Sequence, residues 1–399
     1  MKRFILPLFL CTLLGAAPFQ RNKEQFFDYR TVLLENNFLS LSFAPEQMGR
    51  LASLKLKKNG ADLIGTFKLS RYTETPLFFL DSGNFQGVRE LFWGRSLSGI
   101  APMNVVVKTR SVIAFETKSY GSTNVALVRK VSLLPDTLII SFASVFSNTA
   151  QTDEKFSVWL NLQGAPPAVP AIPVLGKGRV PLRGEMNLYH RPFIFTGAGG
   201  NSNLPPAAEW AAFRLPDKKT VWVMECPSIK QGGFFYSWGN QDHRAPIRTV
   251  EPVFPELTLK PGASSPIIRY RLLVFPGLEQ INALCGDTGA ELCFTGKKVL
   301  LRLVSASAQP QGILTLTLRD TKGKTVCQGT SQLKAQKTGA LLSLEFPCSG
   351  TPVSGTLQIG SRKADIFFEK EAISKVIQKM AKMVSQRAAK GSLKLLPAG

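Results

Sequence analysis

The sequence predicts an all-β protein, with one large antiparallel β domain, a small β-sandwich after it, and a C-terminal helix. Apolar and polar residues alternate with a period of two in many short runs. Turn residues separate those runs, and the chain holds 33 glycines and 26 prolines. No helical periodicity longer than about two turns occurs before residue 365. With 399 residues, of which 44% are hydrophobic, the chain is long enough for two to three domains.

The first 17 residues read as a signal peptide. Lys2 and Arg3 precede an apolar run at 4–14 that is short for a membrane span, and small residues follow it. We therefore expect an exported protein, located in the periplasm, in the cell envelope or outside the cell. Lipidation at Cys11 and an uncleaved membrane anchor are the alternatives.

Residues 26–284 form the predicted large domain. Segments 37–43 and 50–56 alternate apolar and polar residues. Directly after the second segment, Lys58-Asn59-Gly60 is a hairpin turn signal. Further strands are expected at 105–107, 112–116, 126–133 and 137–146. Residues 164–203 are rich in proline and glycine, and we expect an irregular loop there, either functional or simply solvated.

Residues 285–368 form the predicted small sandwich, with strands at 297–303, 312–318, 340–346 and 355–359. This length and spacing suit an immunoglobulin-like sandwich. Residues 369–399 contain one amphipathic helix, at 371–389, with lysines and arginine opposite an apolar stripe. That helix either docks on the protein's own sheet or contacts a membrane surface or a protein partner.

Export makes the cysteines relevant, because exported proteins fold in oxidising surroundings. Four of them lie in the last third of the chain, and we predict two local disulfides, Cys285 with Cys293 and Cys327 with Cys348, although four cysteines permit three connectivities. Cys226 is then left as a buried thiol. A zinc site is a weak alternative, because no paired CxxC spacing or nearby histidine supports it.

The formal net charge is +22, from 49 basic and 27 acidic residues. The lysines are spread along many strands and are not clustered with aromatic residues, so we expect no nucleic-acid partner. Basic charge on an exported protein favours acidic glycans or anionic lipid, or serves solubility alone. We expect no cofactor and no metal, since the chain lacks phosphate-loop, dinucleotide and HExxH motifs and has 2 histidines.

Four segments, in this order along the chain, resemble galactose mutarotase-like (aldose 1-epimerase-like) proteins: 36–49, 131–142 with 159–162, 254–262 and 269–275. The resemblance covers residues 26–284. It implies a β-supersandwich, in which two large antiparallel sheets pack face to face and one concave surface binds a sugar.

The same resemblance implies a glutamate base and two histidines for mutarotation. Glu225 stands at the position of the base, but Gln86 stands at the first histidine position, and the second falls at 156–158, where there is no histidine. Glutamine and serine do not change protonation state near pH 7. The implied function is therefore carbohydrate binding without epimerase activity.

Aromatic side chains stack on sugar faces, while amides, arginines and carboxylates bond hydroxyl groups. On this basis the candidate ligand-binding residues are Gln86, Arg89, Glu90, Trp93, Trp159, Asn161, His190, Tyr236, Trp238 and Arg244. Arg89 and Glu90 form either an internal ion pair facing the cleft or a solvated hairpin end. Trp238 has an equal claim to a place in the core, and each isolated histidine also reads as an ordinary hydrogen-bonding residue.

We expect an exported protein that binds carbohydrate in the concave face, with an acidic glycan as one candidate ligand. The first alternative is a polysaccharide lyase or glycoside hydrolase, with Glu225 or His243 as the catalytic base. The second is a non-catalytic scaffold of the envelope.

Overall fold

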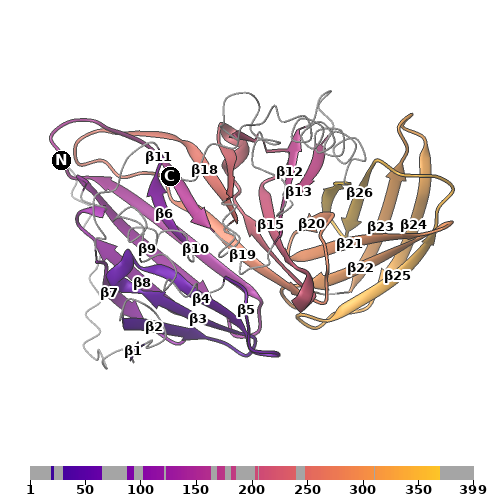
Figure 1. Cartoon of the computed structure of the whole chain (residues 1–399), viewed down its shortest axis with the longest axis horizontal. Coiled ribbons are helices and arrows are strands. Elements are labelled where there is room, and N and C mark those ends of the chain that lie inside the picture. The colour runs from indigo at the N-terminus through magenta and orange to yellow at the C-terminus, as the bar shows by residue number, and fades with distance from the viewer. Residues whose placement is uncertain are drawn as a thin grey trace, which may run out of the picture.

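The computed structural model describes residues 19–21, 30–64, 88–93, 102–120, 123–162, 169–175, 181–185, 203–204, 206–239, 248–309 and 311–368. These segments form four antiparallel sheets, two large and two small. Figure 1 shows the first strands of the chain at one end of the long axis and the last strands, in yellow, at the other. The described part contains no α-helix, only short 3₁₀ turns, so the predicted all-β fold is confirmed.

The first large sheet has ten strands in the order β1-β2-β3-β4-β6-β11-β18-β17-β14, with β5 paired to β4. Its strands are β1 (Phe19–Arg21), β2 (Arg30–Glu35), β3 (Leu39–Ala44), β4 (Arg50–Leu56), β5 (Ala61–Asp62), β6 (Val88–Phe92), β11 (Glu154–Leu162), β14 (Asn203–Leu204), β17 (Phe234–Gly239) and β18 (Arg248–Leu259). The order shows that β6 and β11, far apart in sequence, are neighbours at the centre of the sheet.

The second large sheet has nine strands in the order β13-β12-β15-β16-β19-β10-β9-β8-β7. Its strands are β7 (Asn104–Lys108), β8 (Val112–Thr117), β9 (Val125–Leu133), β10 (Ile139–Asn148), β12 (Val169–Leu175), β13 (Pro181–Glu185), β15 (Trp210–Leu215), β16 (Thr220–Glu225) and β19 (Ile268–Pro276). The predicted irregular segment 164–203 therefore contains strands. Pro170 and Pro173 are tolerated in β12 because it pairs with β15 at 169–171 and with β13 at 171–175, so each proline has a paired strand on one side only.

The inner faces of the two large sheets enclose one apolar core. Phe92 and Phe156 of the ten-stranded sheet have ring centroids 4.4 Å apart, and both contact Phe146 of the nine-stranded sheet. These rings are buried because alternate residues of each strand point inward. This face-to-face packing is the arrangement that the supersandwich prediction requires.

A charged pair crosses this apolar core. Glu90 on β6 is fully buried and its carboxylate accepts hydrogen bonds from Nε, at 3.0 Å, and Nη2 of Arg129 on β9. Ser144 and Tyr270 donate to the same carboxylate, at 2.6 and 3.0 Å. Arg129 Nη1 donates to the carbonyl of Gly49 at 2.7 Å. The pair therefore ties the two large sheets together and is saturated by polar partners, as buried charges must be.

The small sandwich consists of two four-stranded sheets, with orders β20-β21-β22-β25 and β24-β23-β26-β27. Its strands are β20 (Ala283–Cys285), β21 (Thr288–Thr295), β22 (Lys298–Ser305), β23 (Gly312–Arg319), β24 (Thr325–Leu333), β25 (Leu341–Pro347), β26 (Ser354–Ile359) and β27 (Arg362–Ile366). The apolar residues between them form a second core, which includes Leu301, Leu316 and Leu357.

The two sandwiches are fastened to each other at several points. Phe367, just after β27, belongs to the large core and its ring centroid lies 6.0 Å from that of Trp210 on β15. Asn282 Nδ2 donates to the carbonyl of Phe367 at 2.9 Å. Arg271 on β19 binds Asp287 in the β20–β21 turn, with Nη1 2.8 Å from Oδ1. The junction is therefore both apolar and charged.

The structure contains neither of the two predicted disulfides; all five cysteines of its described part are free thiols. Cys285 and Cys293 cannot pair, because Cys285 points into the small core, while Cys293 lies on the other face of the sheet and donates to Glu291. Cys327 and Cys348 do lie side by side, as hydrogen-bonded thiols, and burial together with Cys348 raises the pKa of Cys327 to about 11.

We expect Cys293 to be the first of these thiols to react with iodoacetamide in the folded protein. It is partly exposed, whereas the other four are buried. Burial raises the pKa of Cys293 as well as that of Cys226 and Cys285, so access to the reagent, and not the thiolate fraction, sets the order. Timed alkylation followed by peptide mass spectrometry measures this order. A disulfide-linked peptide joining Cys285 to Cys293 would contradict the strand register.

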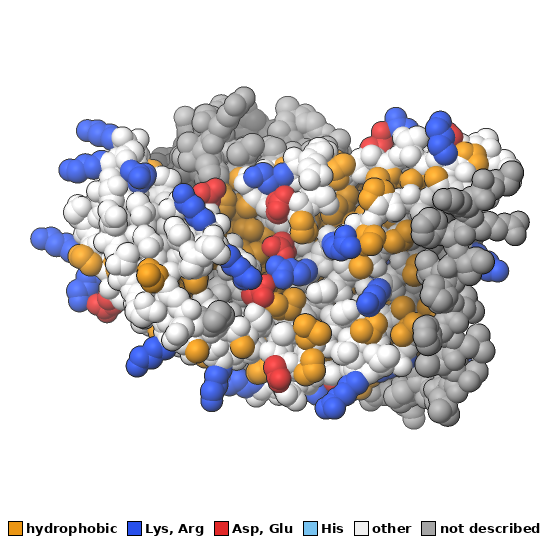
Figure 2. All heavy atoms as spheres, turned by 180° about the vertical axis from the view of Figure 1, so that it is seen from behind, with side chains coloured by type: hydrophobic (Ala, Val, Ile, Leu, Met, Phe, Trp, Pro, Cys, Tyr) orange, Lys and Arg blue, Asp and Glu red, His pale blue; other side chains and the backbone are white. Residues whose placement is uncertain are grey.

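Basic side chains are dispersed over the surface. On the face shown in Figure 2, lysines and arginines are scattered among hydrophobic and uncharged side chains and form no single patch. No helix within the described ranges is long and apolar enough to cross a membrane. The predicted signal peptide at 1–17 and the predicted helix at 371–389 lie outside the described residues.

Candidate functional site

Four aromatic residues gather on the ten-stranded sheet. The ring centroid of Trp93 lies 5.4 Å from that of Trp159, 5.4 Å from that of Phe234 and 4.9 Å from that of Tyr236, all with tilted or edge-on geometry. We call Trp93, Trp159, Phe234 and Tyr236 the aromatic cluster. Each of them is half-buried, so the rings retain exposed surface.

Strand alternation places the aromatic cluster on the outer face of that sheet, away from the second large sheet. Phe92, Val158 and Phe235 are each one residue away from a cluster member and lie in the core. Successive side chains of a strand point to opposite faces, so the cluster residues point outward. The Trp93 amide donates to the carbonyl of Ser157 at 3.0 Å, which extends the β6–β11 ladder to Trp93.

Glu251 adds a carboxylate to the aromatic cluster. It lies on β18 directly opposite Tyr236, and its Oε2 accepts a hydrogen bond from Trp159 Nε1 at 2.9 Å. Burial and, second, the charge of Glu251 raise the pKa of the Tyr236 phenol, so Tyr236 is a neutral hydrogen-bond donor at ordinary pH. Glu251 is only 1% exposed, so its carboxylate orients the Trp159 indole, and the surface itself consists of the rings and the phenol.

Three predicted site residues, Trp93, Trp159 and Tyr236, are brought together by the fold. Phe234 and Glu251 were not predicted. The sequence signal for Phe234 was available, because it lies two residues before Tyr236 on the same strand and so shares its face. No local signal marked Glu251, whose place follows from the pairing of β18 with β17.

Arg89 and Glu90 are not a solvated hairpin end. Both are buried on the central strand β6, and the partner of Glu90 is Arg129, not Arg89. The Arg89 side chain leaves the strand on the side opposite to Glu90, with Nη1 3.6 Å from the sulfur of Met48. Glu90 therefore faces the interior between the sheets and does not face a ligand.

Glu225, the predicted base, lies at the end of β16 in the other large sheet. Arg271 Nε and Nη2 each lie 2.6 Å from its Oε2, and the same guanidinium binds Asp287. Glu225, Arg271 and Asp287 therefore form an ion-pair chain at the junction between the two sandwiches. The carboxylate is committed to this chain and is remote from the aromatic cluster in the sheet topology.

The other predicted site residues are placed only in part. Asn161 lies on β11 opposite Arg89, and Trp238 lies on β17 opposite Thr249. Gln86, His190, His243 and Arg244 lie outside the described residues. Within the described ranges no group of three or more His, Cys, Asp or Glu residues is arranged to hold a metal ion.

No known protein family matches the sequence, and no curated protein matches it. Among solved structures, a galactose mutarotase-like protein from Lactobacillus casei is similar at 14% identity and a TM-score of 0.44, over 61% of this chain and 99% of the other. A putative aldose 1-epimerase from Escherichia coli K12 is similar at 11% identity and a TM-score of 0.42, over 62% and 99%. These structures carry the fold that the sequence resembles, and at this level of similarity they say nothing about activity.

Proposed function

We propose that this chain is an exported carbohydrate-binding protein that holds a glycan on the outer face of the ten-stranded sheet, without epimerase activity. The aromatic cluster, with Glu251 beside it, is the observation that carries the proposal. Tilted aromatic rings offer apolar faces for the C–H groups of a sugar, and the half-buried Tyr236 phenol offers a hydrogen bond to its hydroxyl groups. The buried Glu251 carboxylate holds the Trp159 indole in place.

Two observations support binding without epimerisation. The two histidines that the family's chemistry requires have no counterpart in the sequence at the expected positions. Glu225, which stands where the base is expected, is held by Arg271 at the junction and belongs to the opposite sheet from the aromatic cluster. A general base must be within hydrogen-bond reach of the proton that it removes.

Replacing Trp159 with alanine should weaken glycan binding by at least about tenfold, because the variant loses a stacking face and the hydrogen bond to Glu251. The measurement is a glycan array with the purified chain, followed by titration of the best ligand at two salt concentrations. Weakening by salt would identify an acidic glycan.

The matched control is Phe294→Ala, which removes a partly exposed ring from the small sandwich. It should leave glycan binding unchanged. Equal glycan binding by Trp159→Ala and the parent chain would show that the aromatic cluster is not the binding site. Loss of the bound glycan over time would turn the proposal into a lyase or hydrolase, and an array without any bound glycan would favour a scaffold.

A further inference from the structure

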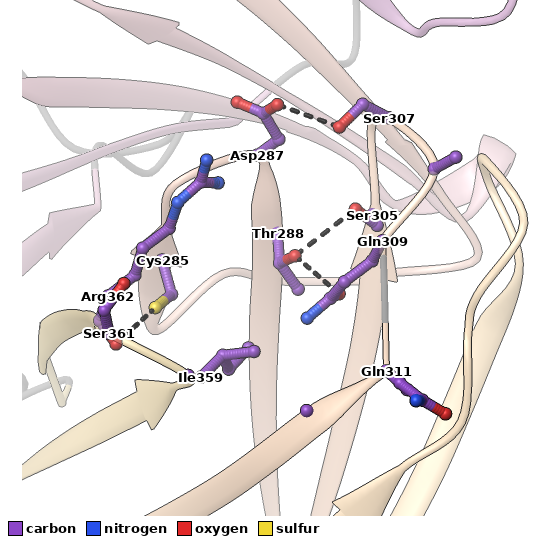
Figure 3. A pocket seen from close by; sticks show the side chains of 13 residues that line it. Cys285, Asp287, Thr288, Ser305, Ser307, Gln309, Gln311, Ile359, Ser361 and Arg362 are labelled. Atoms are coloured by element: carbon purple, nitrogen blue, oxygen red, sulfur yellow. Dashed lines mark hydrogen bonds between the residues drawn. The ribbon is translucent and has the colours of Figure 1, made fainter.

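A polar cavity lies in the small sandwich, away from the aromatic cluster. It has a volume of about 240 Å³. The β20–β21 turn, the segment after β22 and the β26–β27 turn line it, and Figure 3 shows Asp287, Gln309, Ile359 and Arg362 around it. Drug-sized ligands occupy cavities of roughly 300–1,000 Å³, so this cavity suits a smaller ligand, of the size of one sugar ring.

Both oxygens of the acidic residue of this cavity already have hydrogen-bond donors. Asp287 Oδ1 accepts from Arg271 Nη1 at 2.8 Å, and its Oδ2 accepts from the Ser307 hydroxyl at 2.8 Å. One carboxylate oxygen is therefore occupied by Arg271 at the junction and the other by Ser307 of the cavity wall. Because Arg271 is shared with Glu225, these three side chains keep a net charge of −1, and an anion in the cavity requires a further cation.

Arg362 supplies that further cation, on an exposed side chain at the mouth of the cavity. Within the described ranges no carboxylate lies within ion-pair distance of its guanidinium, and no hydrogen bond joins that group to another residue. Its side chain lies across Gly286, where an added Cβ would come within 2.2 Å of Nη1. Gly286 also has a positive φ of 62°, so glycine there serves both the turn and the close approach of Arg362.

The remaining wall supplies hydrogen-bond donors and one apolar surface. Thr288 Oγ1 donates to Gln309 Oε1 at 3.0 Å, which turns the Gln309 amide nitrogen toward the cavity, as Figure 3 shows. Ser361 adds an exposed hydroxyl at the rim. Ile359 provides the apolar side. A cation, an amide donor, a hydroxyl and an aliphatic wall are complementary to a ring that carries both hydroxyl groups and a carboxylate.

We propose that this cavity binds one hexuronate, a sugar whose carboxylate pairs with Arg362. A guanidinium binds a carboxylate through two parallel N–H···O bonds, and the sugar hydroxyl groups are then within the reach of Gln309 and Ser361. The site is separate from the aromatic cluster and does not depend on it.

The test is a calorimetric titration of the full chain with glucuronate or galacturonate, and with glucose or galactose as the uncharged counterparts. Hexuronate should bind at least about tenfold more tightly than the neutral sugar, since a hydrogen bond to a charged group is the strong kind. Arg362→Gln should remove that difference. The matched control is Lys363→Gln, an exposed cation one residue along the same strand, which should leave it intact.

Two further variants test the cavity independently of Arg362. Gln309→Leu should weaken hexuronate binding even if Arg362→Gln disturbs the β26–β27 turn. Trp159→Ala should leave hexuronate binding intact, so that the cavity and the aromatic cluster are tested separately. Equal affinity for hexuronate and neutral sugar, or an unaffected Arg362→Gln variant, would overturn the proposal. Equal affinity for inorganic phosphate would also overturn it and make the cavity a general anion site.

Discussion

Replacing Glu90 with glutamine should lower the free energy of unfolding by about 3–5 kcal/mol. The substitution leaves the Arg129 guanidinium charged and unpaired between the two large sheets, where neither residue has more than 1% of its side chain exposed. Burying a charge without a counter-charge is among the most costly changes in a protein interior. Urea unfolding followed by tryptophan fluorescence measures the loss.

Two further variants separate the ion pair from the burial of the residue. Removing both charges, as Glu90→Leu with Arg129→Met, should restore most of the loss, because no unpaired charge then remains in the core. Glu256→Gln breaks an exposed pair with Lys155 in the same ten-stranded sheet and should cost less than about 1 kcal/mol. A Glu90→Gln variant as stable as the Glu256→Gln control would show that water reaches Arg129.

Stability should fall steeply above about pH 10, by about 1.4 kcal/mol per pH unit for each of two buried tyrosines. Burial raises the pKa of Tyr120 and of Tyr270 well above the usual range for a phenol, and the charge of Glu90 adds to the effect. The folded chain therefore keeps protons that the unfolded chain releases above about pH 10. This contribution is fully present below that pH and is lost as the pH rises.

Urea titrations between pH 9 and 11 measure this slope. Tyr270→Phe should be less stable at neutral pH by about 1–3 kcal/mol, because the Glu90 carboxylate loses the hydrogen bond that Tyr270 donates. The free energy of unfolding of this variant should then fall by about 1.4 kcal/mol per pH unit, half the slope of the parent chain, since one of the two titrating groups is gone. Parallel pH profiles for Tyr270→Phe and the parent chain would show that Tyr270 does not drive alkaline unfolding.

The sequence predicted the strands well because period-two alternation is a local property. The segments read as strands at 37–43 and 50–56 correspond to β3 (Leu39–Ala44) and β4 (Arg50–Leu56). Three of the four members of the aromatic cluster were predicted from residue type, because aromatic side chains stack on sugar faces, and the strand pairing then showed that they share one face.

What the sequence missed depends on pairings between distant segments. Glu90 finds its counter-charge 39 residues away, on the facing sheet, and no local pattern points to Arg129. The wrong pairing of Cys285 with Cys293 has the same origin. A separation of eight residues looks right for a hairpin, but the register leaves the two side chains on opposite faces.

Phe367 makes the last described strand of the chain matter to the first domain. The chain enters the small sandwich after β19, contributes Leu284, Val304 and Ala306 to the large core on the way, and ends with Phe367 in that core beside Trp210. Removal of the small sandwich would leave an uncovered apolar site on the larger one, and Arg271 would lose Asp287 and keep only Glu225. The two sandwiches are thus separate in architecture but not in folding, and a hinge between them would have to break a hydrophobic core rather than bend a linker.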